Sequence, residues 1–296
     1  MTNTTILRPC NGWDLLKTVI GQTTKIEIER LESLARQARG AIVELSWSAQ
    51  APHLGSSLSC VDILVAAYWH ALRFDPEKPH DPNRDRLILS KGHAAQALYT
   101  VLNMLGLLDA ELLKTFNRDG GRLAEHPGPN CALGVEAATG SLGHGLPIGV
   151  GLALAGKVHK RNYRTFVVLS DGECNEGSVW EAALLAAAQK LENLFVIIDY
   201  NKWQATDRSD HVMALHPLVE KWSAFGWSAS EIDGHDVGAL ASAMEYPTVG
   251  GGKPVALIAH TVKGKGVSFM EDDNNWHYRL PTEEEVILAR RELRLE

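Results

Sequence analysis

The chain has 296 residues, of which 45% are hydrophobic and 22% charged, and these proportions exclude a disordered protein for most of its length. Lys and Arg together number 29 against 36 for Asp and Glu, so the formal net charge is −7. Because nucleic-acid binding needs a basic surface, this balance argues against nucleic acid as the main partner.

The four cysteines, Cys10, Cys60, Cys131 and Cys174, form no CxxC pair and are too widely spaced for a zinc ribbon or a dense disulfide framework. We therefore expect four reduced thiols. Residues 1–20 show neither the continuous apolar segment nor the cleavage site of a secretion signal. No run approaches the ~18 apolar residues of a membrane span. These features predict a cytoplasmic protein without a membrane partner.

Residues 1–24 are polar and rich in threonine, so we expect an N-terminal extension there, followed by one domain over residues 25–296. No internal repeat, low-complexity tract or interdomain linker interrupts that domain. From Lys25 to Trp47, apolar residues recur at intervals of three and four, which predicts its first helix.

Ser59 and Asp62 resemble a capping box with the shorter acid, which predicts a second helix ending at Leu72. The segment FDPEKPHDPNRDR follows and, with three prolines, must be a loop. Periodicity and apolar runs predict the later elements. The predicted strands are at 87–90, 164–170, 194–199, 227–232 and 254–260, and the predicted helices are at 94–105, about 146–160, 178–190 and 236–244. A capping box of Thr282 and Glu285 predicts a further helix at the C-terminus.

The order strand, helix, strand over residues 164–199 is a βαβ unit, whose two strands are parallel. Both strands are apolar on both faces, as in a sheet that helices cover on each side. The sequence therefore predicts a single α/β domain with a doubly wound, mainly parallel sheet flanked by helices.

Polar residues follow both strands of this unit at their carboxyl ends, where ligands bind in open parallel sheets. The first strand is followed by Asp171 and Gly172, and the second by Asn201. If the strands are neighbours, these carboxylate and amide oxygens are ligands that Mg²⁺ prefers, and the start of the helix at 178–190 offers free N–H groups to a diphosphate. The alternative is structural: Asp171 caps the following helix, and Asn201 occupies an ordinary turn.

Four of the twelve histidines, His53, His93, His126 and His277, lie in loops rather than in predicted helices. A lone loop histidine is more often solvated, but four facing one crevice would suit proton transfer and phosphate contact near pH 7. A nicotinamide site is disfavoured, because the glycine-rich run GSLGHG at 140–145 does not follow a convincing strand.

Residues 171–201, DGECNEGSVWEAALLAAAQKLENLFVIIDYN, resemble the thiamine-diphosphate signature, in which an Asp-Gly pair is followed by an Asn-bearing pair. Four further motifs, PHLGSSLS, SKGH, GVEAATGSLGHG and HTVKGKG, occur in the order that transketolases have. The resemblance runs from about residue 30 to 280 and is to the N-terminal, diphosphate-binding subunit of split transketolases.

This resemblance implies roles for the matching residues. Asp171 and Asn201 match the side-chain ligands of Mg²⁺, and Trp203 stands where a backbone carbonyl completes the shell. Glu176 matches an acid that links paired cofactor sites across the dimer. The residues implied to bind the cofactor are His93, Gly140, Leu142, Asp171, Gly172, Glu176 and Asn201. The residues implied to act in catalysis are His53, His93, His126 and His277, with His53 and His277 nearest the substrate.

Three residues depart from the family pattern. Ser170 replaces the first Gly of the GDG signature, which the family requires less than the Asp. Pro52 replaces the Gly usual before His53 and is expected to fix that loop differently. Trp203 is bulkier than the usual aliphatic residue and would crowd or stack near the thiazolium, although its carbonyl should still serve as a ligand.

The resemblance implies an enzyme that transfers a two-carbon ketol unit from a ketose or ketose phosphate to an aldose, with thiamine diphosphate and Mg²⁺. In that family, the Glu that contacts the aminopyrimidine belongs to a second, pyrimidine-binding domain, which nothing after residue 280 could supply. We therefore expect the partner to be a separate C-terminal subunit, the assembly to be an α2β2 tetramer, and this chain to be inactive alone.

Two other functional interpretations of the sequence remain open. The α subunit of a 2-oxo-acid decarboxylating dehydrogenase shares the cofactor signature, but not SKGH, the GSLGHG run or the late Trp-His element. A non-catalytic cofactor-binding or regulatory remnant is the other. The intact pair of Asp171 and Asn201 and the full histidine set argue against such decay.

Overall fold

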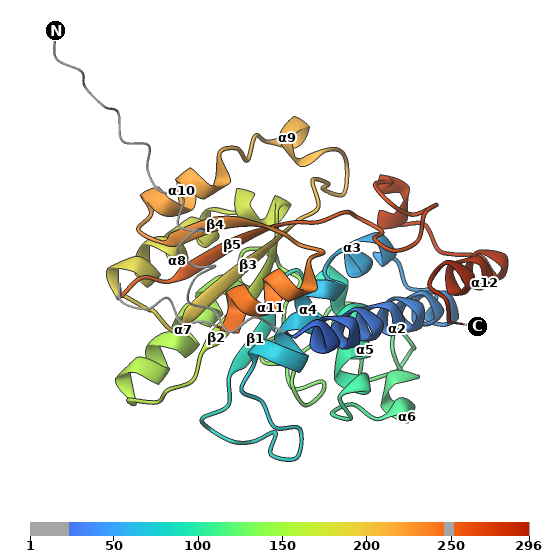
Figure 1. Cartoon of the computed structure of the whole chain (residues 1–296), viewed down its shortest axis with the longest axis horizontal. Helices are drawn as coiled ribbons and strands as arrows, with labels where there is room; N and C mark the ends of the chain where they lie inside the picture. Colours follow the sequence, from blue (N-terminus) through green and yellow to red (C-terminus); the bar gives the residue numbers. More distant parts are fainter. Residues whose placement is uncertain (1–23, 246–251, 296) are drawn as a thin grey trace, which may run out of the picture.

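The computed structural model describes residues 24–245 and 252–295 of the chain. Within them, five strands form one parallel sheet in the order β1-β2-β3-β5-β4 (Figure 1). The strands are β1 (Arg86–Leu89), β2 (Thr165–Ser170), β3 (Leu194–Tyr200), β4 (Ser228–Asp233) and β5 (Val255–His260).

Helices cover both faces of this sheet. In Figure 1, α7, α8 and α10 lie on one side of the strands, and α2, α4, α5 and α11 lie on the other. The helices are α2 (Lys25–Ala49), α3 (Leu54–Ser59), α4 (Val61–Ala66), α5 (Ala95–Met104), α6 (Ala110–Leu113), α7 (Gly145–Val158), α8 (Gly177–Ala188), α9 (Ser209–Val212), α10 (Leu218–Ala224), α11 (Val237–Glu245) and α12 (Glu283–Glu292).

Alternate side chains of each strand enter two separate cores, one on each face of the sheet. Phe166 and Val168 of β2 belong to the core formed with α2, α4, α5 and α11. Val167 and Leu169 belong to the other core, with α7, α8 and α10. Because both faces are buried, the central strands are apolar throughout, as their sequences indicate. The prediction of a doubly wound α/β domain is confirmed.

The periodic segments of the sequence form the predicted helices, with boundaries shifted by a few residues. The capping box at the start of α12 is present in full, since Thr282 accepts from the Glu285 backbone while the Glu285 side chain accepts from Thr282. The capping box predicted at Ser59 and Asp62 is wrong. Ser59 is the last residue of α3, Cys60 precedes α4, and the Ser59 hydroxyl donates to Asp199 (2.6 Å) instead.

The helix predicted to end at Leu72 changes character before that residue. After α4, residues 67–71 form a π-helical turn, and Leu72 is extended. Cys60, Cys131 and Cys174 are buried free thiols, and Cys10 lies outside the described residues, as does most of the predicted N-terminal extension. Among the described helices, none has the length and apolar character needed to cross a bilayer.

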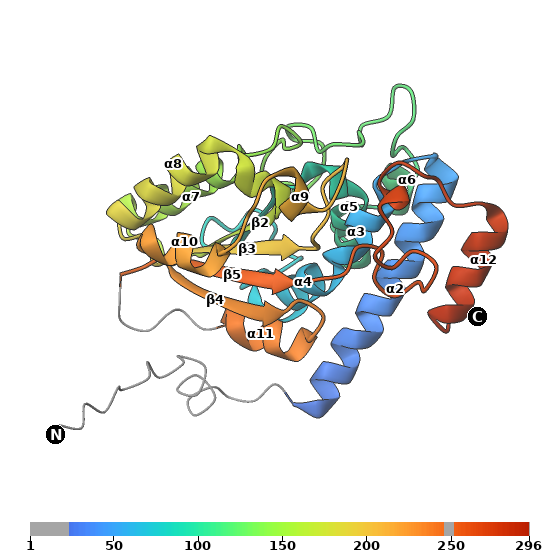
Figure 2. The ribbon, with the colours of Figure 1, turned by 90° about the horizontal axis from the view of Figure 1, so that it is seen from above.

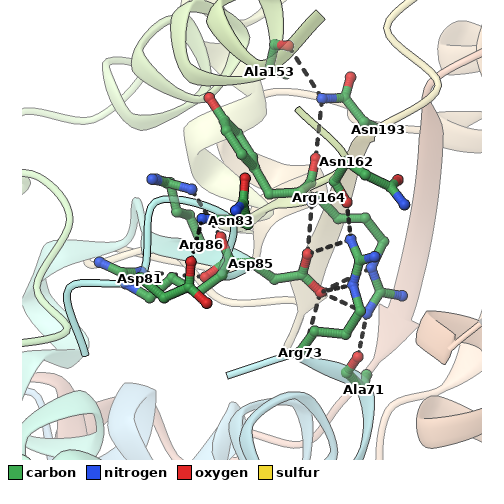
Figure 3. A network of polar contacts seen from close by, with 12 residues as sticks. Ala71, Arg73, Asp81, Asn83, Asp85, Arg86, Ala153, Asn162, Arg164 and Asn193 are labelled. Carbon is green, nitrogen blue, oxygen red and sulfur yellow. Dashed lines mark hydrogen bonds and ion pairs between the residues drawn. The ribbon is translucent and has the colours of Figure 1, made fainter. Parts of the chain in front are cut away.

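Asp85 organises the amino-terminal edge of the sheet. Its buried carboxylate accepts hydrogen bonds from the Arg164 backbone (2.7 Å) and guanidinium, and from the guanidinium of Arg73 (Figure 3). Burial alone would raise the pKa of Asp85, but the two arginines lower it. A cavity of about 960 Å³ adjoins this network. It lies at the opposite end of the strands from Asp171, so it is not the predicted ligand site.

Candidate active site

The carboxyl ends of β2 and β3 lie side by side, as predicted, because Ser170 of β2 pairs in register with Asp199 of β3. Asp171 therefore meets the residues that follow β3. Its Oδ2 accepts hydrogen bonds from the Lys202 backbone N–H and the Ser209 hydroxyl, each at 2.8 Å. The arrowheads of β3 and β5 point to the same side in Figure 2, towards α3.

Asp171 is fully buried, and this burial raises the pKa of its carboxyl to about 6 in spite of the hydrogen bonds it accepts. Its Oδ1 accepts from the Gly172 backbone (2.8 Å), so Asp171 also caps the 3₁₀ helix of residues 172–175. The structural alternative is thus met in part, but a cap alone does not explain a fully buried carboxylate.

Asn201 and Gln204 lie on the same edge. Asn201 Oδ1 accepts from the Trp203 backbone (3.0 Å), and its Nδ2 lies 3.4 Å from the Ser59 hydroxyl. Gln204 Nε2 is buried without a hydrogen-bond partner among the described residues. A side chain on Gly172 would collide with Gln204, since an added Cβ would lie 2.9 Å from Gln204 Cγ. The amide N–H of Gln204 is therefore a donor without a partner close to the buried Asp171 carboxylate. Such a pair suits an anionic ligand held with a cation.

Beneath these residues lies a fully buried ion pair, Lys91 with Asp199. Lys91 also donates to the Ser56 carbonyl (2.9 Å), while Asp199 accepts from the hydroxyls of Ser59 and Thr261. Burial alone would lower the pKa of Lys91, but Asp199 and the other neighbours raise it. The pair thus joins the SKGH turn, the PHLGSSLS helix and the ends of β3 and β5.

The structure brings the four predicted histidines together. The ring centroid of His53 lies 4.9 Å from that of His277, 5.6 Å from that of His93 and 5.8 Å from that of His126. His93 follows Lys91 by two residues, and His53 immediately precedes α3, which carries Ser59. The histidine cluster, defined by these four residues, is therefore continuous with the Lys91–Asp199 pair.

Burial keeps three members of the histidine cluster neutral near pH 7. It lowers the pKa of His277 to about 3, with Lys263 adding to the effect, and lowers the pKa of His93 with Lys91. His53 lies 2.8 Å from Glu125 Oε1, without hydrogen-bond alignment. Burial outweighs the attraction of this carboxylate, so the pKa of His53 is also lowered.

The backbone around His53 is unusual. His53 has a φ of 67°, a left-handed conformation that a non-glycine residue adopts at an energetic cost. Its N–H donates to the His277 carbonyl (2.8 Å), and the Pro52 carbonyl accepts from Gln96 (2.8 Å). These contacts hold the loop that carries Pro52 between the late Trp-His element and α5.

Glu173, which no sequence pattern indicated, anchors the glycine-rich loop to the sheet. It is fully buried and accepts hydrogen bonds from Ser90, from the Gly143 backbone (2.8 Å) and from the Ser170 backbone (3.3 Å). Burial raises the pKa of its carboxyl. Leu142 is half-buried in the anchored loop, and Glu176 is exposed at the start of α8.

Replacing Gly140 by alanine is expected to lower the free energy of unfolding by about 1–3 kcal/mol. Gly140 has a φ of 127°, and a new Cβ would lie 2.6 Å from Cδ2 of His126. Gly151→Ala on α7 is the matched control, because no atom of the described residues lies within 4 Å of its Cβ position and alanine favours a helix by about 0.5–1 kcal/mol. Urea unfolding compares the two; equal effects would contradict the close approach at Gly140.

The indole of Trp203 has two defined neighbours. Its Nε1 donates to Asp272 Oδ1 (2.8 Å), and the Arg208 guanidinium lies 3.8 Å from the ring centroid. Arg208 also pairs with Asp272 (2.6 Å). Asp272 and Arg208 therefore fix the position of the Trp203 side chain.

The sequence analysis missed five residues of this site, which are Lys91, Glu125, Glu173, Asp199 and Lys263. Lys91 and Lys263 lie inside motifs that were recognised, SKGH and HTVKGKG, but a lysine in a glycine-bearing loop is usually exposed. Both are fully buried here. The apolar and small residues on either side of each lysine were the available signal.

Residues 32–296 match the family model described as "Transketolase, thiamine diphosphate binding domain". The chain is 40% identical over 268 residues to a subunit of the apulose-4-phosphate transketolase of Phocaeicola vulgatus, and the match covers 90% of this chain and 95% of that protein. It is 41% identical to the 6-deoxy-6-sulfo-D-fructose transketolase subunit SqwG of a Clostridium species, over 78% of this chain and 84% of the other.

Solved structures agree with these sequence relationships. Transketolase from Campylobacter jejuni superposes with a TM-score of 0.84 and 30% identity, over 92% of this chain and 44% of that one. Transketolase from Leishmania mexicana superposes with a TM-score of 0.82 and 26% identity, over 89% and 41% of the two chains. Human transketolase is 38% identical over 85% of this chain, which spans 40% of the human protein.

The chain therefore belongs to the transketolase family of enzymes and contains its thiamine diphosphate binding domain. It matches nearly the whole length of the apulose-4-phosphate transketolase subunits, but less than half of the longer transketolases. Within the family it corresponds to the N-terminal subunit of a split transketolase, as the five motifs predict. These matches argue against the interpretation of the chain as the α subunit of a 2-oxo-acid decarboxylating dehydrogenase.

Proposed function

We propose that this chain is one half of an enzyme that transfers a two-carbon ketol unit from a ketose or ketose phosphate to an aldose, using thiamine diphosphate and Mg²⁺. The observation that carries the proposal is the histidine cluster beside Asp171 and Asn201, at the carboxyl ends of the central strands. The names of the split-transketolase relatives support a sugar or sugar phosphate as donor. The binding unit is proposed to span residues 25–296, in a cytoplasmic protein.

The residues at the strand ends fit a metal-bound diphosphate. Asp171, Asn201 and the Trp203 carbonyl would hold Mg²⁺, which takes oxygen ligands. The unpartnered Nε2 of Gln204 would donate to a phosphate oxygen. Gly140, Leu142, Gly172 and His93 would line the cofactor, and Glu176 would reach a paired site. Thiamine diphosphate, when bound, supplies the electron sink needed to break a carbon–carbon bond beside a carbonyl.

The histidine cluster would move the protons of the sugar hydroxyls. His277 Nδ1 lies 3.1 Å from Lys263 Nζ, which has hydrogens to donate, so we infer that Nε2 carries the ring hydrogen. A neutral His277 can then donate from Nε2 to a substrate oxygen. His53, also neutral and next to Glu125, can accept a proton and share its charge with that carboxylate. His93 and His126 would bind the diphosphate and the sugar.

The chain is proposed to work with a C-terminal subunit that carries the pyrimidine-binding domain, in an α2β2 tetramer. Two relatives, each named for one subunit of an apulose-4-phosphate transketolase, support this partnership, since 95% and 98% of their length aligns with this chain. The active site would then lie between the two kinds of subunit.

Purified chain with thiamine diphosphate, Mg²⁺, a ketose phosphate and an aldose is expected to show no turnover. Addition of a pyrimidine-domain subunit is expected to start it, because the aminopyrimidine of the cofactor needs a carboxylate from that subunit. Product formation is followed by chromatography, and calorimetry checks that the lone chain binds the cofactor. Turnover by the chain alone would contradict the partner requirement. Absence of cofactor binding would contradict the proposed function itself.

A further inference from the structure

A largely buried network of three side chains connects α2, α4 and the turn after β4. Its members are Arg39, Asp62 and His235. The Arg39 guanidinium pairs with both oxygens of Asp62, one of them at 3.1 Å. Asp62 Oδ2 lies 2.7 Å from His235 Nδ1. Arg39 and Asp62 are only 5% and 6% exposed, so this ion pair is held away from water.

Arg39 and His235, at the two ends of this network, both bind the short loop of residues 262–265, which follows β5. His235 Nε2 accepts a hydrogen bond from the Val262 backbone (2.8 Å), and Arg39 Nε donates one to the Lys265 carbonyl (2.9 Å). Because Nε2 is an acceptor, Nδ1 must carry the ring hydrogen and donate it to Asp62. Burial alone would raise the pKa of Asp62, but Arg39 and His235 lower it, so the acceptor is a carboxylate.

Lys263 lies between the two anchored positions and reaches the histidine cluster. Its Nζ donates to Asn274 Oδ1 (2.6 Å) and lies 3.1 Å from His277 Nδ1. The next residue, Gly264, donates to the Gly55 carbonyl (2.9 Å) and has a φ of 79°. A Cβ at Gly264 would lie 2.1 Å from the Met270 carbonyl, so this loop is closely packed.

We propose that Arg39, Asp62 and His235 form a positioning device that fixes the Lys263 amine against His277. The backbone of the loop is fixed at its first N–H and its last carbonyl, so the direction of the side chain between them is determined. A buried ion pair adds little net stability over an apolar contact, but it does impose orientation. The importance of this device for sugar chemistry rests on the proposed function, whereas the positioning itself does not.

Two substitutions of His235 separate its two hydrogen bonds. The amide of His235→Asn reaches only as far as Nδ1, so it keeps the bond to Asp62 and loses Val262. The longer His235→Gln places its amide oxygen where Nε2 was and keeps the acceptor for Val262. Both variants remove the ring and are expected to lower the thermal midpoint by similar amounts, which makes each the stability control of the other.

The readout is the titration of Lys263, followed by NMR of the side-chain Cε–Hε signals in the full-length chain with isotope-labelled lysine. Lys263→Arg identifies the signal, and neither cofactor nor partner is present. Burial, with Lys91 nearby, lowers the pKa of Lys263 to about 7. His235→Asn is expected to raise this pKa by more than about one unit, towards the ordinary value, as the freed amine becomes solvated. His235→Gln is expected to leave it near that of the wild type.

An unchanged Lys263 titration in both variants would overturn the proposal, because the loop would then be placed without His235. Equal increases in both would also overturn it, since they would reflect a general loosening rather than the Val262 hydrogen bond. In the reconstituted two-subunit enzyme, His235→Asn is expected to lower kcat while His235→Gln restores it. Because the titration needs no cofactor, failure of the proposed function would leave its result intact.

Discussion

Replacing Asp171 by asparagine is expected to weaken the binding of thiamine diphosphate with Mg²⁺ by at least about 100-fold, since losing a group that merely orients a ligand already costs about 10–100-fold. The change keeps the size of the side chain but removes the charge that a divalent cation requires. Asp171 is fully buried directly after the last residue of β2, so the substitution removes a negative charge that the fold holds at one defined place. Calorimetric titration of the chain with the cofactor, with and without Mg²⁺, measures the loss.

Asp119→Asn makes the same chemical change at an exposed loop position and serves as the control. It is expected to leave the cofactor affinity as it is in the wild type. Circular dichroism of both variants shows that the fold is retained. Cofactor affinity within threefold of the wild type in Asp171→Asn would contradict the assignment of Asp171 as a metal ligand.

Breaking the buried pair of Lys91 and Asp199 is expected to cost about 3–5 kcal/mol of unfolding free energy for either single substitution, Lys91→Met or Asp199→Asn. Each removes one partner; Lys91→Met leaves a buried carboxylate and Asp199→Asn a buried ammonium, both without an opposite charge. The double substitution removes both charges, so its cost should be smaller than the sum of the two single costs. Urea unfolding of the four proteins forms the double-mutant cycle.

Ser59 and Thr261 donate to separate oxygens of Asp199, and an asparagine amide has only one oxygen. Asp199→Asn therefore keeps an acceptor for one of the two hydroxyls, and the cost of the double variant includes the loss of the other hydrogen bond. Lys114→Met, on an exposed lysine paired with Glu111, is the matched control and should change stability by less than about 1 kcal/mol. Strict additivity of the single costs would show that the two charges do not stabilise one another.

The placement of Asp171 and Asn201 at one edge of the sheet could be predicted because it depends on local sequence. Asp171 and Asn201 each follow an apolar segment that is recognisable as a buried strand, and a βαβ unit makes two such strands parallel. Only the adjacency of the strands remained to be established, and the register of Ser170 with Asp199 supplies it. The order of the five strands, in contrast, depends on packing between distant segments.

The error at Ser59 shows the limit of the local pattern. A hydroxyl residue three positions before an acid is typical of a capping box, but here both side chains have distant partners: Ser59 donates to Asp199, and Asp62 pairs with Arg39 and His235. Hydrogen bonds to charged groups are stronger than those to a backbone N–H at a helix end, so the tertiary contacts prevail.

The sequence by itself determined the class of fold, the motifs and the identity of the residues that carry them, because periodicity, capping and strand ends are properties of neighbouring positions. Only the tertiary structure decided that His53, His93, His126 and His277 converge, and that Lys91 and Lys263 are buried beside them. Burial and charge pairing arise where loops from separate strands meet. Burial keeps His53, His93 and His277 neutral near pH 7, and this state follows from that meeting and has no signature in any single segment.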